Sequence, residues 1–190
     1  MCGRFFIKAE DPQMAKAHKE ALASLEGLAL DPKALKTGEI FPGDVVPVLT
    51  AANRFTAMKW GFSVFKGRLT INARTETAAI KPLFQEAYRV RRCLTLASAY
   101  FEWRTEGSKK TKYRIAALNQ PLYLAGLYRE EPLRPLPVMT ILTRAAGPKI
   151  AALHDRTPLI VPGDQIEVWL SSKEAPVITP LEDLDYEPVF

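Results

Sequence analysis

The first residues of the chain hold the groups with the most unusual chemistry. The chain begins Met1-Cys2-Gly3-Arg4, so removal of Met1 would leave Cys2 with a free α-amine beside its thiol. An α-amine has a reference pKa of about 7.7–8.0, so a useful fraction is unprotonated at neutral pH and can condense with an aldehyde to an imine. The neighbouring thiol can then close a five-membered thiazolidine. The alternative is that Cys2 is merely the second residue of the translated chain.

Two ionisable residues further along could handle the protons of such a reaction. Glu102 lies between Phe101 and Trp103, at the end of a predicted strand. A carboxyl group held against aromatic surface has its charged form disfavoured, which suits acid–base catalysis near neutrality. His154 follows an apolar helical turn. The competing interpretations are a surface glutamate and a structural histidine.

Polar side chains also alternate with apolar ones around residue 73. Asn72 and Arg74 are separated by Ala73, so in an extended segment both side chains point to the same side. An amide and a guanidinium on one face suit recognition of sugar hydroxyls or phosphate, although a polar strand face has the same pattern. Arg4 would share the face of Cys2 and could place a phosphate beside it.

Composition places the chain among ordinary globular proteins. The 190 residues suffice for one core, and 47% hydrophobic and 25% charged residues argue against disorder. Two cysteines do not make a disulfide framework, no apolar run approaches the length of a membrane span, and no leader is present, so we expect a cytoplasmic protein that does not cross a membrane. The net charge of +5 is compatible with a polyanion partner but does not require one.

The pattern of apolar residues predicts many strands and few helices. Asp11 and Pro12 resemble the start of a helix that ends near Leu25. Further helices are expected over 82–90, irregularly over 143–153 after Thr143, and over 164–170. Strands are expected at 3–7, 45–49, 55–60, 69–72, 93–97, 113–117, 122–127, 138–142 and 159–161, with a tail from about 171 that is extended and peripheral. Without strict alternation of strands and helices, this predicts an α+β fold in a single domain, 1–190.

Common catalytic signatures are missing from the sequence. It contains no phosphate-binding glycine loop and no Ser/His/Asp signature, and its two histidines and two cysteines are widely scattered. We therefore expect neither a metal nor a cofactor.

Several short stretches, taken together, resemble the SOS response-associated peptidase family, whose members shield and process abasic sites in single-stranded DNA through a DNA–protein crosslink. The resemblance extends from Cys2 to about Val161. It implies mixed and antiparallel sheets that form a barrel-like core flanked by short helices. Departures from the family pattern fall at Ala99, Leu96, Thr157 and the order Tyr100-Phe101. The stretches are Cys2-Gly3-Arg4-Phe5, Trp60-Gly61-Phe62, Ile71 to Glu76, Tyr100-Phe101-Glu102-Trp103 and His154-Asp155-Arg156-Thr157-Pro158.

The resemblance also implies roles for individual residues. Cys2 would be the crosslinking nucleophile after loss of Met1, and Asn72 would orient the sugar and the amine. Glu102 would open the deoxyribose to its aldehyde, and His154 would assist proton transfer. The DNA-binding residues would be Arg4 and Arg74 on phosphates, and Trp60 and the Pro42 loop against bases. The implied protein is a monomer that binds abasic single-stranded DNA, with accompanying lyase activity and autoproteolytic removal of Met1.

Two other functions remain open from the residues alone. Cys2 could serve as the N-terminal nucleophile of a cysteine peptidase or amidohydrolase, with Glu102 and His154 assisting acyl transfer. The chain could also be a non-catalytic module that binds single-stranded DNA. A stable adduct with abasic DNA, peptide cleavage, or salt-sensitive binding without an adduct would separate the three.

Overall fold

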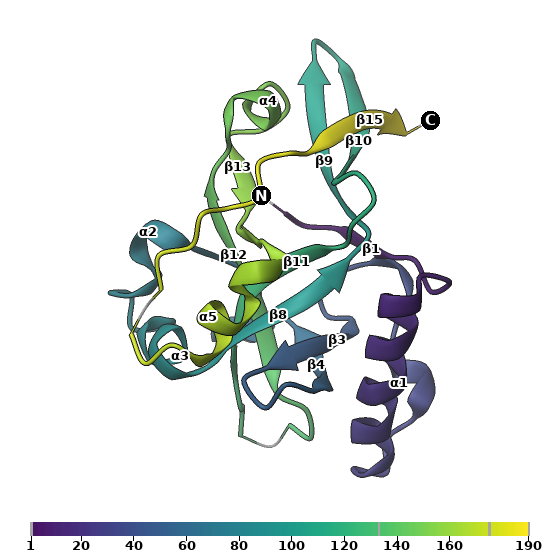
Figure 1. Cartoon of the computed structure of the whole chain (residues 1–190), viewed down its shortest axis with the longest axis vertical. Helices are drawn as coiled ribbons and strands as arrows, with labels where there is room; N and C mark the ends of the chain where they lie inside the picture. Colours follow the sequence, from purple (N-terminus) through teal and green to yellow (C-terminus); the bar gives the residue numbers. More distant parts are fainter. Residues whose placement is uncertain (1, 133, 175, 190) are drawn as a thin grey trace.

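The computed structural model describes residues 2–132, 134–174 and 176–189 (Figure 1). Among these residues β-strands dominate and the helices are mostly short, as the sequence predicts. The helices are α1 (Pro12–Glu26), α2 (Thr75–Ala78), α3 (Gln85–Val90), α4 (Pro148–Ala151) and α5 (Ile166–Ser171), with 3-10 turns η1 (Pro32–Ala34), η2 (Phe65–Gly67) and η3 (Gly163–Gln165). The strands are β1 (Phe5–Ile7), β2 (Gly38–Ile40), β3 (Val45–Thr50), β4 (Phe55–Trp60), β5 (Phe62–Ser63), β6 (Leu69–Thr70), β7 (Asn72–Arg74), β8 (Arg92–Ala97), β9 (Ala99–Glu106), β10 (Lys109–Ala116), β11 (Leu122–Arg129), β12 (Val138–Ala145), β13 (Arg156–Pro158), β14 (Ile160–Val161) and β15 (Asp185–Val189).

The larger sheet closes into a ring of strands. Its order is β12-β4-β3-β8-β11, and β11 pairs again with β12. The β12–β4 pairing is parallel and the other pairings in the ring are antiparallel. Neighbouring residues of β8 pack in two different hydrophobic clusters, Cys93 in one and Leu94 in another. Because both faces are covered, these strands are almost continuously apolar rather than alternating.

A second sheet carries the beginning of the chain into the core. Its order is β15-β10-β9-β1-β2, with Phe5 of β1 opposite both Ile40 and Tyr100. Cys2 and Phe5 are fully buried and belong to the same hydrophobic cluster. The short N-terminal strand therefore anchors the segment before it inside the protein.

Helix α1 forms where the sequence predicts it. The Asp11 carboxylate accepts hydrogen bonds from the backbone N–H groups of Gln13 and Met14 at 2.9 and 3.3 Å, which satisfies donors that a helix leaves unpaired at its N-terminus. The apolar residues Met14, Ala17, Ala21 and Leu25 are buried. The helix thus covers strands β3 and β4 with one face (Figure 1).

Two sequence-based expectations need correction. The helix expected over 143–153 is shorter, because β12 continues to Ala145 by pairing with β13 and α4 begins only at Pro148. The tail is extended, but it is more than peripheral: Leu184 is buried, and β15 pairs with β10 as the edge strand of a sheet.

Gly126 marks the tightest approach between β11 and β12. A Cβ atom there would lie 2.9 Å from the Thr140 carbonyl oxygen and 3.1 Å from Cys93 Sγ. We expect Gly126→Ala to lower the free energy of unfolding by about 2 kcal/mol, because an overpacked core must shift backbone or side chains. Denaturant unfolding measures this. Gly163→Ala is the control, since a Cβ there meets no atom within 4 Å; equal stability of both variants would contradict the packing argument.

Candidate active site

Cys2 and Asn72 are brought together from opposite parts of the chain. Asn72 lies at the start of β7, which runs parallel to β12, and its Nδ2 donates a hydrogen bond of 2.9 Å to the Cys2 carbonyl oxygen. The Asn72 Oδ1 atom is buried and has no hydrogen-bond partner within the described part of the chain. The amide thus holds Cys2 with one end and leaves an acceptor inside the site with the other.

Glu102 lies in the middle of β9, rather than at the end of a strand as the sequence suggested. Glu102 is buried, with 3% of its surface exposed. Burial raises the pKa of its carboxyl group, and the charge of His154 offsets part of this effect. Glu102 therefore interacts electrostatically with His154.

The Cys2 thiol interacts electrostatically with the Glu102 carboxylate. Burial raises the pKa of the thiol well above its usual range, and the negative charge of Glu102 raises it further. Cys2 is fully buried, and its Sγ lies 3.9 Å from the Arg4 carbonyl oxygen. The resting sulfur is consequently a protonated thiol, which must lose its proton before or while it attacks.

His154 follows α4 and is held by the backbone. Its Nδ1 lies 2.9 Å from the backbone N–H of Arg156 and 2.8 Å from the Asp155 carboxylate. A neutral ring nitrogen cannot accept from one and donate to the other. The N–H is fixed by the chain, whereas the Asp155 side chain is 84% exposed, so we assign Nδ1 as the acceptor. When the ring is neutral, its proton is then on Nε2, which is the nitrogen that can donate.

An ion pair that the sequence analysis missed ties two of the quoted stretches together. Arg156 Nη1 and Nη2 contact the two carboxylate oxygens of Glu76 at 2.5 and 2.9 Å, and Nη2 also donates to the Thr143 carbonyl oxygen at 2.6 Å. These hydrogen bonds lower the pKa of Glu76 to about 2. Both residues stood in the quoted stretches, but their spacing of 80 positions gave no signal that they pair.

The two arginines predicted to bind phosphate differ in their surroundings. Arg74 is exposed, and no ion pair or hydrogen bond is recorded for its side chain within the described residues. Arg4 is instead engaged: its Nη1 contacts Glu39 Oε1 at 2.8 Å. Arg4 lies two residues after Cys2 and Arg74 two residues after Asn72, but of these two cations only Arg74 has its charge unopposed within the described residues.

The expectation that Trp60 stacks on a base is wrong for this structure. Trp60 is fully buried, its Nε1 donates to the Ile71 carbonyl oxygen at 3.0 Å, and its ring lies 5.0 Å from that of Phe5. Trp60 is a core residue that supports β1. Exposed rings occur nearby in sequence, at Phe41 (44% exposed), beside the exposed Pro42, and at Phe65 (81% exposed) in the β5–β6 connection.

A hydroxyl pair lies on the same face of β9 as Glu102. The Tyr100 hydroxyl is 2.9 Å from Thr157 Oγ1, and both residues are buried. Tyr100 interacts with the charges of Cys2 and Glu102. Two of the departures from the family pattern thus contact each other and fill one part of the site.

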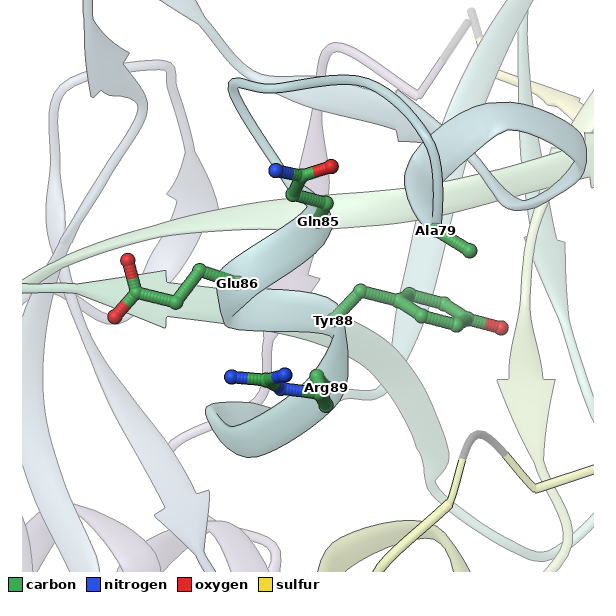
Figure 2. A pocket seen from close by; sticks show the side chains of 5 residues that line it. All are labelled: Ala79, Gln85, Glu86, Tyr88 and Arg89. Atoms are coloured by element: carbon green, nitrogen blue, oxygen red, sulfur yellow. The ribbon is translucent and has the colours of Figure 1, made fainter.

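A surface hollow lies elsewhere on the molecule. It is formed along α3 and is lined by Ala79, Gln85, Glu86, Tyr88 and Arg89, with the Tyr88 ring directed toward Ala79 and the Glu86 carboxylate on the opposite side of the helix (Figure 2). Cys2, Asn72, Glu102 and His154 are not among the residues that line this hollow.

Neither metal ligands nor a membrane span emerge from the described residues. They contain no group of three His, Cys, Asp or Glu residues that could hold a metal ion. No helix among them has the length and apolar character needed to cross a membrane.

The second residue of this α+β chain thus lies beside an amide and within the field of a carboxyl group, and an imidazole interacts electrostatically with that carboxyl group. Residues 1–189 match the sequence model of the SOS response associated peptidase (SRAP) family, and the chain belongs to this family.

Several known proteins resemble the chain. It is 28% identical over 211 residues to the abasic site processing protein YedK of Escherichia coli, covering 100% of this chain and 92% of that protein. It is 30% identical over 193 residues to the abasic site processing protein YoqW of Bacillus subtilis, covering 91% and 81%. A crystal structure of a Bacteroides thetaiotaomicron protein shares the fold, with a TM-score of 0.74 at 20% identity over 100% of this chain and 92% of that one.

The Glu76–Arg156 pair predicts a pH-dependent loss of stability. The pKa of Glu76 is about 2 in the folded protein against an ordinary value of 4.5, so the contribution of the ion pair to stability is complete above pH 4.5 and is lost as the pH falls toward 2. The Glu76 side chain is 48% exposed, so solvent screening limits the effect of Glu76→Gln to about 1 kcal/mol at neutral pH. Urea unfolding at several pH values measures it. A difference between wild type and variant that persists at pH 2 would contradict this assignment.

Proposed function

We propose that the chain is an abasic-site processing protein that forms a covalent thiazolidine between Cys2 and the ring-opened deoxyribose of single-stranded DNA. The observation that carries the proposal is the enclosure of Cys2 beside Asn72, with the charge of Glu102 acting on the Cys2 thiol and the charge of His154 acting on Glu102. The names of relatives such as YedK and YoqW support the same substrate. Removal of Met1 is the required first step, since an acylated nitrogen cannot form an imine.

The first chemical step is imine formation. An abasic deoxyribose is in equilibrium with an aldehyde at C1′, and the Cys2 amine adds to this carbon to give a carbinolamine that loses water. Glu102 can supply the proton for the departing hydroxyl group, because burial raises its pKa and favours the protonated form. The unpaired Asn72 Oδ1 can accept a hydrogen bond from the amine or from a sugar hydroxyl.

The second step closes the ring. The Cys2 sulfur bonds to C1′, the π electrons of the protonated imine pass to nitrogen and leave a neutral N–H, and the thiol proton goes to the Glu102 carboxylate, which restores the carboxyl group that donated in the first step. The raised pKa of the thiol means that attack needs such a base nearby. The overall reaction joins one aldehyde to one aminothiol and releases one water. Ring closure also removes the imine that would make the C2′ protons acidic, and so suppresses strand cleavage by β-elimination.

DNA binding is supported by exposed cations and rings around the N-terminal segment. Arg74 is available for a phosphate, and Phe41 beside Pro42 offers a ring for a base. Phe65, with Lys66 5.4 Å from its ring, takes the stacking role expected of Trp60. Because such contacts are largely electrostatic, binding should weaken as the salt concentration rises.

The processed protein and a Cys2→Ser variant test the aminothiol requirement. With abasic single-stranded DNA, wild type lacking Met1 should give an adduct that survives denaturation, since sulfur closes the ring. The variant should give at most a transient imine, because a hydroxyl is the weaker nucleophile. Denaturing electrophoresis and the intact mass of each protein supply the readout. Crosslinking by protein that retains an N-terminal tag would contradict the mechanism.

Replacing the buried carboxyl group tests its role as acid and base. Glu102→Gln should slow adduct formation by about 100-fold without weakening DNA binding. It should also remove the part of the pH–rate profile that reflects titration of Glu102, whose pKa lies above its ordinary value of 4.5. Quenched time courses at several pH values provide the test. An unchanged rate would exclude Glu102 from the reaction.

The contribution of Arg74 is electrostatic and should depend on salt. Arg74→Ala is expected to weaken binding to single-stranded DNA and to reduce the slope of log K against log salt by about 0.7, as for one lost phosphate contact. Arg54→Ala is the matched control, because Arg54 is also exposed but lies in the β3–β4 connection. Equal slopes for the two variants would show that Arg74 makes no specific phosphate contact.

A further inference from the structure

Two cations share one carboxylate beside the candidate site. Glu39 Oε1 accepts hydrogen bonds from Arg4 Nη1 at 2.8 Å and from Lys112 Nζ at 2.6 Å. Glu39 belongs to β2 and Lys112 to β10, strands that are separated in their sheet by β9 and β1. The side chains of Arg4, Lys112 and Glu39 are 27%, 22% and 31% exposed, so the cluster is shielded from solvent but open to a ligand.

Aromatic rings support both cations. The Arg4 guanidinium carbon lies 3.9 Å from the centroid of Phe41, and Lys112 Nζ lies 4.0 Å from that of Phe101. Trp103 is near both, at 5.4 and 5.9 Å. Cations held on aromatic faces are the combination with which proteins bind the phosphates and bases of a single strand.

The carboxylate of Glu39 opposes this use of the cluster. Arg4 and Lys112 together carry two positive charges, and Glu39 cancels one of them. Burial alone would raise the pKa of Glu39, but the hydrogen bonds from Arg4 and Lys112 outweigh it and lower the pKa, so the carboxylate stays ionised at neutral pH. A phosphate that approaches Arg4 finds Nη1 already occupied and a negative charge beside it.

We propose that Glu39 is a built-in competitor for phosphate at the Arg4–Lys112 pair, which weakens the reversible grip of the protein on single-stranded DNA. This inference rests on the proposed function, because the strand is the ligand. Weak reversible binding would let undamaged strands dissociate readily, so that only a strand that carries an aldehyde is retained, through its covalent bond to Cys2. Glu39 is thus a specificity-determining residue that never touches the reacting atoms.

Binding of Glu39→Gln and wild type to a fluorescent single strand without an abasic site tests the proposal. Glutamine has nearly the same size, and its amide oxygen can still accept from Arg4 and Lys112, so their positions are retained while the charge is removed. The variant should bind about fivefold more tightly at about 50 mM salt, and its slope of log K against log salt should be steeper by about 0.7. Fluorescence anisotropy at several salt concentrations measures both quantities, and thermal unfolding verifies that the variant is folded.

Glu86→Gln is the matched control for net charge. Glu86 pairs with Arg91 at 3.4 Å on α3, well away from β10 in Figure 1. Its binding should equal that of wild type. A tightening of equal size in both variants, or no change in Glu39→Gln, would overturn the proposal.

The direction of the effect separates competition from positioning. Weaker binding by Glu39→Gln with a shallower salt slope would show that Glu39 serves to place the two cations, and would also overturn the proposal. These results concern reversible binding alone and leave the crosslink to be judged by its own assay. Absence of binding by wild type, in contrast, would refute the proposed DNA-binding function as well.

Discussion

The structure of the site depends on the burial of a chain terminus. Most proteins leave their first residues at the surface, but here β1 inserts between β2 and β9 and takes Cys2 into the core. The hydrogen bond from Asn72 to the Cys2 carbonyl oxygen then fixes the backbone of this segment. Only a terminal cysteine offers an amine and a thiol together, so in the proposed mechanism loss of Met1 would expose this pair inside the fold, where side chains of the protein surround it.

The environment of Cys2 is adjusted by burial more than by opposite charges. Glu102 and the Cys2 thiol both have raised pKa values, with loss of solvent as the main cause in each case. Neutral forms are therefore favoured for both groups at rest, and protons are present where the proposed reaction must move them. Arg74 and the Glu39 cluster are more exposed, and in the proposed function they act on the polyanionic strand and not on the reacting carbon. In this account the reacting groups are buried, and the groups that attract the DNA strand are the more exposed ones.

Much of the fold follows from local patterns in the sequence. Helix α1 was predictable because Asp11 and Pro12 are a strong start signal and the buried residues recur with helical spacing. The irregular helix expected over 143–153 forms only as the short α4, since the pairing of β12 with β13 depends on contacts that no local pattern encodes. The same limit applies to the site. Sequence spacing suggested that Asn72 and Arg74 share a face, but the Glu76–Arg156 and Glu39–Lys112 pairs join distant segments and were not predictable. Trp60 was misjudged because residue type alone does not distinguish a ring that stacks on a ligand from one that packs on Phe5.

The state of the C1′ carbon after reaction tests the central claim most directly. Abasic single-stranded DNA labelled with ¹³C at this carbon would be reacted with protein lacking Met1, and the adduct would be examined by NMR. The account predicts a tetrahedral carbon bonded to both nitrogen and sulfur of Cys2. A trigonal imine carbon in the stable product, or attachment to any other residue, would contradict it.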